Sequence, residues 1–333
     1  MKGADHKTRI KRMARSQWYS LSVPANLPGV ETFKMRSQIL LALLPALGTE
    51  AIRIIHANDD GWAELYTRSF HDALVAAGHD TVLAAPAENK SGTASSDAEP
   101  SPRTIACQYD SCPANTNQPI GRNESSPRLN WVNSFPVTSM RYGIDTIAPP
   151  FWNGQAPELA VSGPNVGSNV YVQVHFSGTV GAAVFAAKER RLPAIAFSGL
   201  SSGTLAWNTI PVPTRSLVYA QVASKLVDAV VSSGKPYLPE DVFLNVNLPK
   251  VEGKCTDPHN FKFVLSRINV GLFSAKDVYH CGTDRLPLEA SVALSDDCLV
   301  SVSVGDANDK TTAPKEKQDI VLNKLRGLLT CLP

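Results

Sequence analysis

Two adjacent aspartates, Asp59 and Asp60, follow the apolar run at residues 52–57 and precede Gly61. Two carboxylates side by side repel each other unless a cation lies between them. Oxygen ligands suit Mg²⁺ or Mn²⁺, whereas zinc sites in proteins draw mainly on Cys and His. The pair therefore predicts a divalent cation site, and the alternative is a solvated Asp-Gly turn in which Asp60 caps a helix.

Three further stretches carry polar side chains where predicted strands end or helices begin: "SGT" at 91–93, "SGPNVGSN" at 162–169 and "FSGTVGAA" at 176–183. The residues Ser177 to Thr179 precede an Ala-rich helix. The first N–H groups of a helix and the positive end of its dipole favour an anion. This stretch is therefore the best candidate for binding a phosphate, and Ser177 or Thr179 can cap the helix at the same time.

The elements that position these residues follow from hydrophobic periodicity. The β-branched run at 52–55 predicts a buried strand, a helical stripe covers 62–77, and 82–85 reads as a second strand. In this β-α-β unit the aspartates lie at the carboxyl end of the first strand, where open parallel sheets bind ligands. Alternation continues to residue 249, with strands at 158–163, 192–199 and 242–249 and helices at 180–190 and 214–233.

The predicted fold is therefore α/β: a doubly wound, mostly parallel, Rossmann-like sheet in three layers. Residues 87–130 are small, polar and rich in Pro, and they predict a long irregular region. Beyond residue 250 the pattern loosens into strand-like runs at 261–265 and 299–304 and a helix at 318–329. These predict a C-terminal extension of strands and a helix.

The charge distribution bears on the kind of partner. Residues 1–48 hold eight Lys and Arg against two acids, so the other residues hold 24 basic and 28 acidic side chains, a formal charge of about −4. A nucleic-acid polymer requires a concentrated basic surface. The composition therefore argues against such a partner and favours a small-molecule substrate.

The N-terminal region resembles a targeting segment. Residues 35–48 combine Arg36, an apolar run from Ile39 to Leu47, and the small residues Ala46 and Gly48, a pattern typical of a secretory signal peptide. The run is too short to span a bilayer. We therefore expect a secreted mature chain without a membrane segment that begins near Thr49. If the basic leader 1–48 has another role, the location is organellar or cytoplasmic.

The six cysteines all lie beyond this segment, and their even number suits an oxidising compartment. Cys107 and Cys112 enclose so small a loop that their pairing is the simplest prediction.

Taken together, "NDDG" at 58–61 and the three stretches above resemble, in order and spacing, the SurE family of survival-protein phosphatases. The resemblance covers residues 52–248, with a weaker echo at 296–307. The insertion that contains Cys107 and Cys112, together with the leader, resembles the secreted fungal acid-phosphatase branch. This resemblance implies one domain over 49–333, with a core at 52–249 and an extension at 250–333.

The resemblance also implies an activity: hydrolysis of nucleoside monophosphates or other phosphate monoesters by metal-activated water, in a homodimer or homotetramer. It assigns Mg²⁺ or Mn²⁺ to the ligands Asp59, Asp60, Ser91 and Asn165. It assigns catalysis to Asp59, Asp60 and Asn169, and phosphate binding to Asn169, Ser177, Gly178 and Thr179.

Two departures from the family pattern bear on substrate preference. Tyr171 stands where a glycine is usual, and "AEL" at 63–65 replaces Ala-Pro-Gly. Two other classes of protein stay open. A non-catalytic secreted binding protein would have lost metal ligands, and a nucleotide-sugar transferase would need a second set of β-α units after residue 250.

Overall fold

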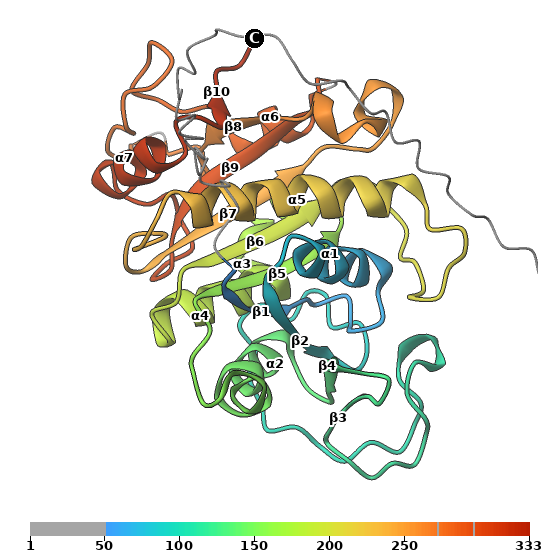
Figure 1. The fold of residues 1–333 in the computed structure, drawn as a ribbon. Helices are drawn as coiled ribbons and strands as arrows, with labels where there is room; N and C mark the ends of the chain where they lie inside the picture. Colours follow the sequence, from blue (N-terminus) through green and yellow to red (C-terminus); the bar gives the residue numbers. More distant parts are fainter. Residues whose placement is uncertain (1–50, 272, 296) are drawn as a thin grey trace, which may run out of the picture. The chain divides into compact units, whose positions relative to one another are not determined.

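The computed structural model describes residues 51–271, 273–295 and 297–333. The predicted leader 1–48 and its signal peptide 35–48 lie outside these residues. The strands are β1 Arg53–Ala57, β2 Asp80–Pro86, β3 Ile120–Asn123, β4 Ser126–Val132, β5 Leu159–Val166, β6 Ala194–Gly199, β7 Val242–Leu248, β8 Lys262–Ser266, β9 Leu299–Asp306 and β10 Leu329–Thr330. They form one sheet in the order β10-β8-β9-β7-β6-β5-β1-β2-β4-β3 (Figure 1).

The helices are α1 Leu65–Ala76, α2 Pro136–Tyr142, α3 Gln173–Phe176, α4 Gly178–Glu189, α5 Thr214–Ser232, α6 Glu289–Ala293 and α7 Lys315–Lys324. Short 3₁₀ turns occupy Gln108–Asp110, Pro149–Trp152, Gly253–Thr256 and Pro258–Asn260, and a π turn occupies Gly143–Ile147.

The sheet is parallel from β4 through β2, β1, β5 and β6 to β7. One apolar layer joins it to α1 and α5, which lie side by side in Figure 1, and includes Phe70 and Leu226. A second layer, with Met140 and Ala183, joins the sheet to α2 and α4. These two layers confirm the predicted three-layer α/β fold with its mostly parallel sheet.

The C-terminal extension reverses direction at β9, which pairs antiparallel with β7. Strands β8 and β10 then run parallel to β9. The predicted helix at 318–329 starts earlier, at Lys315, and ends at Lys324. Residues 329–330 instead form β10, because they pair with β8 and the strand register decides their backbone.

The predicted irregular region 87–130 is wrong at its end, where the chain forms β3 and β4. Strand β4 begins with Ser126-Pro127-Arg128, a sequence with little intrinsic preference for a strand. Strand β4 pairs in parallel with β2, and Leu129 lies opposite Leu83. The hydrogen bonds of this pairing stabilise a strand that the local sequence does not predict. A tertiary contact therefore overrides local composition here.

All six cysteines are paired. The predicted bridge Cys107–Cys112 is confirmed. Two further bridges, Cys255–Cys298 and Cys281–Cys331, tie the C-terminal extension to itself. Removing a native disulfide from a small secreted domain typically costs about 2–5 kcal/mol, so these links are a substantial constraint on the extension.

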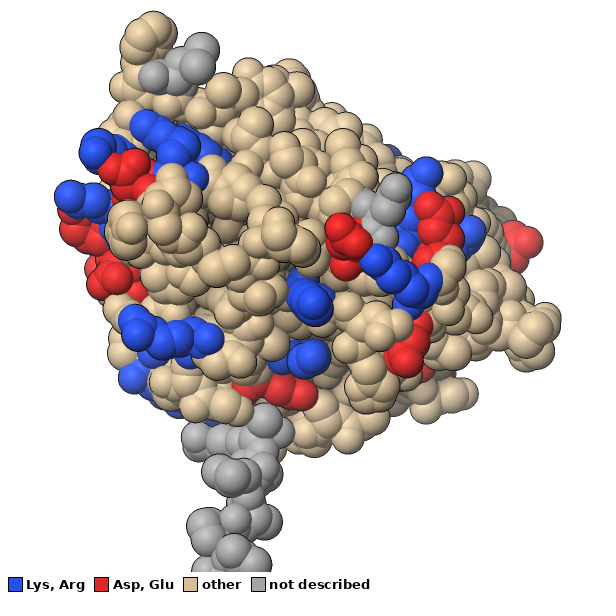
Figure 2. Space-filling model, turned by 90° about the horizontal axis from the view of Figure 1, so that it is seen from above, with Lys and Arg blue, Asp and Glu red and all other residues tan. Residues whose placement is uncertain are grey.

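The surface shows no single-sign charge field on the face drawn in Figure 2, where Lys and Arg lie next to Asp and Glu among broad uncharged areas. Within the described residues, every helix is too short or too polar to cross a bilayer.

Candidate functional site

The predicted site residues converge at the carboxyl edge of the sheet. Strands β5, β1 and β2 are parallel neighbours, so the loops that follow them meet at one edge. These loops and α3 surround a hollow of about 450 Å³. Its lining includes five of the eight predicted residues, namely Asp59, Ser91, Asn165, Asn169 and Ser177. The other three, Asp60, Gly178 and Thr179, contact members of this group directly.

Asp59 is held by the start of α4. The Thr179 hydroxyl donates to Asp59 Oδ1, and the backbone N–H groups of Gly178 and Thr179 donate to the same carboxylate. Burial raises the pKa of Asp59, and these hydrogen bonds oppose the shift. The anion at the N-terminus of α4 is therefore Asp59 itself, while Ser177 Oγ caps the helix by accepting from the Val180 N–H at 3.1 Å.

Gly178 is required by the closeness of this contact. A Cβ atom at this position would lie 2.9 Å from Asp59 Cβ and 2.8 Å from Pro136 Cγ. Separations below 3 Å between such atoms demand that one of them moves. Any side chain at Gly178 would therefore force Pro136 or Asp59 to move.

Asp60 accepts hydrogen bonds from a different set of donors than Asp59. It accepts hydrogen bonds from Asn89 Nδ2 at 3.0 Å, Ser91 Oγ at 3.1 Å and the Val166 N–H at 2.6 Å. Burial, and secondly the charge of Asp59, raise the pKa of Asp60 to about 7. Two neighbouring carboxylates are thus kept apart by two separate sets of donors, yet their mutual repulsion persists.

The donor set fits a hard divalent cation. No Lys, Arg or His of the described residues forms an ion pair with Asp59 or Asp60, so their negative charge lacks a cationic partner there. Ser91 Oγ and Asp60 Oδ1 are 3.1 Å apart, and two oxygens bound to one octahedral Mg²⁺ are separated by about 3 Å. Asn165 commits Nδ2 to the Gly167 carbonyl at 2.8 Å, which leaves Oδ1 as a further oxygen ligand.

Asn169 lines the same hollow and is almost fully buried. Its Nδ2 donates to Ser198 Oγ at 2.8 Å, and its backbone N–H donates to Asn247 Oδ1 at 2.8 Å. A side-chain amide has two N–H donors and a carbonyl oxygen. One N–H and the oxygen of Asn169 are therefore left for a ligand.

Sequence reasoning missed several residues of this site. Asn89 donates to Asp60, and Val172 and Phe176 line the hollow with exposed fractions of 53% and 65%. Phe176 directly precedes the Ser-Gly-Thr stretch, which is the signal that could have found it. Tyr171, one of the two departures from the family pattern, does not belong to the lining.

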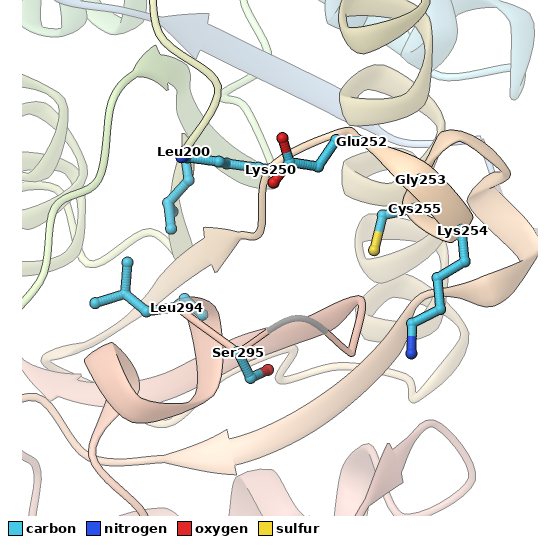
Figure 3. A pocket seen from close by; sticks show the side chains of 9 residues that line it. Leu200, Lys250, Glu252, Gly253, Lys254, Cys255, Leu294 and Ser295 are labelled. Atoms are coloured by element: carbon cyan, nitrogen blue, oxygen red, sulfur yellow. The ribbon is translucent and has the colours of Figure 1, made fainter.

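A larger hollow of about 510 Å³ lies beyond the end of β7, beside the Cys255–Cys298 bridge. Figure 3 shows Leu200, Lys250, Glu252 and Leu294 around it. None of the predicted site residues lines it. The volume of a hollow therefore does not identify the functional site. We take the smaller hollow, which holds the carboxyl pair, as the candidate site.

The fold and the site define a class of protein: a three-layer α/β protein with a cluster of buried oxygen donors at the carboxyl edge of its sheet. The model of the family described as Survival protein SurE matches residues 54–262. The chain belongs to the SurE family.

Individual relatives agree with this assignment. An acid phosphatase of Yarrowia lipolytica is 32% identical over 311 residues, which cover 84% of this chain and 86% of the relative. A 5'-nucleotidase SurE of Geobacter metallireducens is 29% identical over 198 residues, which cover 60% of this chain and 65% of the relative. The crystal structure of a SurE protein from Aquifex aeolicus has a TM-score of 0.52 at 19% identity and covers 81% of this chain and 98% of its own.

Proposed function

We propose that this chain is a metal-dependent phosphoric monoester hydrolase that acts on nucleoside monophosphates or other small phosphate monoesters. Relatives named acid phosphatase and 5'-nucleotidase support the class of reaction. The observation that carries the proposal is the buried Asp59–Asp60 pair, joined to the Ser91 hydroxyl in a hollow that Asn165 and Asn169 also line.

The proposed site has two groups of side chains, one for the metal and one for the phosphate. Asp59, Asp60, Ser91 and Asn165 would hold Mg²⁺ or Mn²⁺, which polarises a phosphoryl oxygen and lowers the pKa of a water. Asn169 lines the hollow, and its remaining side-chain N–H would donate to a phosphate oxygen. Fixed donors of this kind stabilise the charge that develops on the transferred group.

The start of α4 would contribute in two ways. Ser177 lines the hollow and would face the phosphate. Gly178 and Thr179, also predicted to bind phosphate, are engaged with the Asp59 carboxylate. They would therefore orient Asp59 and lend the positive end of the helix to the site.

Two rival functions fit the molecule less well. The intact set of oxygen donors speaks against a binding protein that has lost its metal. After β7 the described residues add β8, β9 and β10 with two short helices rather than a second set of β-α units, which speaks against a nucleotide-sugar transferase. The three disulfides support secretion. From the family resemblance we also propose a homodimer or homotetramer that acts on small substrates rather than on nucleic acid or membranes.

Phosphate release from nucleoside monophosphates and p-nitrophenyl phosphate, with a chelator and with added Mg²⁺ or Mn²⁺, tests the proposal. We expect the chelator to abolish activity and either cation to restore it. Full activity in the chelator would contradict the metal site.

The metal requirement should also depend on pH. Because the pKa of Asp60 lies near 7, protons compete for this ligand below pH 7. The Mg²⁺ concentration for half-maximal activity should therefore rise about tenfold or more from pH 7.5 to pH 5.5.

The rim of the hollow predicts a preference for leaving groups with a flat apolar surface. Phe176 is 65% exposed at the lining, and its carbonyl accepts from the Ala94 N–H at 3.0 Å, which fixes the backbone there. Stacking of a base on an aromatic ring contributes roughly 1–3 kcal/mol. Phe176→Ala should therefore lower kcat/KM about tenfold for a purine monophosphate or an aryl phosphate and much less for glycerol phosphate.

Phe273→Ala is the matched control, because Phe273 is fully exposed and lies outside this lining. Equal losses for all three substrates in Phe176→Ala would show that Phe176 supports the site rather than the leaving group.

A further inference from the structure

The loop between β5 and α3 carries Asn169, and polar side chains of β7 hold its backbone. The Asn169 N–H donates to Asn247 Oδ1 at 2.8 Å. Its carbonyl accepts from Asn245 Nδ2 at 2.8 Å and from Asn247 Nδ2 at 3.1 Å. Both backbone groups of Asn169 are thus fixed by fully buried side chains.

One carboxylate from the C-terminal extension completes this network. Glu289, the first residue of α6, is fully buried. It accepts from the Tyr171 N–H at 2.8 Å and from Asn245 Nδ2 at 2.9 Å, and the Ser303 hydroxyl of β9 also bonds to it. Glu289 therefore links the site loop to β7 and β9.

Two features of this network are unfavourable for folding: a buried carboxylate without an ion pair among the described residues and a left-handed tyrosine backbone. Such features are often kept at functional sites. No Lys, Arg or His of the described residues forms an ion pair with Glu289, and burial raises its pKa to about 7. Tyr171 also adopts a left-handed backbone with φ of +53°, which is unfavourable for a side chain as bulky as tyrosine. Such a conformation persists only where its surroundings fix it, and the Tyr171 N–H is fixed by Glu289.

We propose that Glu289 is a positioning residue: it holds the backbone from Asn169 to Tyr171 so that the Asn169 side chain meets the substrate phosphate. This role rests on the proposed function of Asn169. Glu289 lies outside residues 54–262, the segment that matches the family model. The C-terminal extension is then part of the site, although none of its residues lines the hollow.

The test compares Glu289→Ala and Glu289→Gln with the wild type, in kcat/KM for p-nitrophenyl phosphate, inhibition by inorganic phosphate, and half-saturating Mg²⁺. Alanine removes all three hydrogen bonds, whereas glutamine has a single side-chain oxygen and can keep the bond from either the Tyr171 N–H or Asn245 Nδ2, but not both. We expect kcat/KM to fall about thirtyfold in Glu289→Ala and about fivefold in Glu289→Gln, with weaker inhibition by phosphate. Half-saturating Mg²⁺ should stay within about twofold, because Glu289 has no hydrogen bond to the proposed metal ligands.

Glu316→Ala and Glu316→Gln are the controls, since Glu316 is an exposed residue of α7. If Glu289→Ala does not fold, Glu289→Gln, which keeps the volume of the side chain, decides the matter alone. Wild-type kinetics in the Gln variant, or a loss of Mg²⁺ affinity equal to the loss of phosphate affinity, would overturn the role of Glu289. Failure of the proposed function would be seen separately, as a wild-type protein that releases no phosphate.

Discussion

Asp59→Asn and Asp60→Asn should each lower kcat/KM about a hundredfold or more, because losing one carboxylate weakens both cation affinity and the stabilisation of charge in the transition state. Asn keeps the size of Asp, so packing is preserved. At residue 60 the Ser91 hydroxyl, now 3.1 Å from Asp60 Oδ1, can rotate to accept from the new amide.

In the metal-free protein, Asp60→Asn should not lower the stability of the fold, although it lowers the activity. The pKa of Asp60 is raised to about 7 by burial and by Asp59. A carboxyl whose pKa is higher in the folded than in the unfolded state destabilises the fold as pH rises above its unfolded value near 4. Removing that charge should therefore leave Tm of metal-free Asp60→Asn at pH 8 equal to or above that of the wild type.

Asp72→Asn is the matched control, because Asp72 is an exposed residue of α1 away from the hollow. The measurements are kcat/KM at saturating Mg²⁺ and thermal unfolding in a chelator. Full activity in both site variants would refute the proposed metal site, and a large drop in Tm in both would move the cause from the chemistry to the fold.

Gly178→Ala should also be severely impaired, although it adds a single methyl group. The new Cβ would lie 2.9 Å from Asp59 Cβ and 2.8 Å from Pro136 Cγ, so at least one of these side chains has to shift, and we expect Asp59 to be displaced. A displacement of about 1 Å in a catalytic group can cost a hundredfold in rate. We expect kcat/KM to fall roughly 10- to 100-fold, with half-saturating Mg²⁺ raised.

Two comparisons separate this displacement from helix effects. Gly178→Pro also removes the N–H that donates to Asp59 and should be at least as damaging. Thr179→Ala loses one hydroxyl donor and should be milder. Gly327→Ala controls for the substitution itself, since a Cβ there meets no atom within 4 Å. Wild-type kinetics in Gly178→Ala would mean that the position of Asp59 does not limit the reaction.

Local sequence determined the central elements and the position of the carboxyl pair. The β-branched apolar run before Asn58 predicts a buried strand, and an open parallel sheet places the residues that follow such a strand at its ligand-binding edge. The pairing of Cys107 with Cys112 followed from their separation alone. Each of these features depends on residues close together in the chain, and local periodicity encodes such features directly.

Only the tertiary structure decided what surrounds the carboxyl pair. Strand β4 exists because it pairs with β2, and Asp59 receives the amide of Gly178 from an element far along the chain. Asn245 reaches the loop of Asn169 from β7, and Glu289 reaches the same loop from α6, which precedes β9, the antiparallel neighbour of β7. Sheet order brings these groups together, and sheet order results from the packing of the whole chain rather than from any short stretch of it.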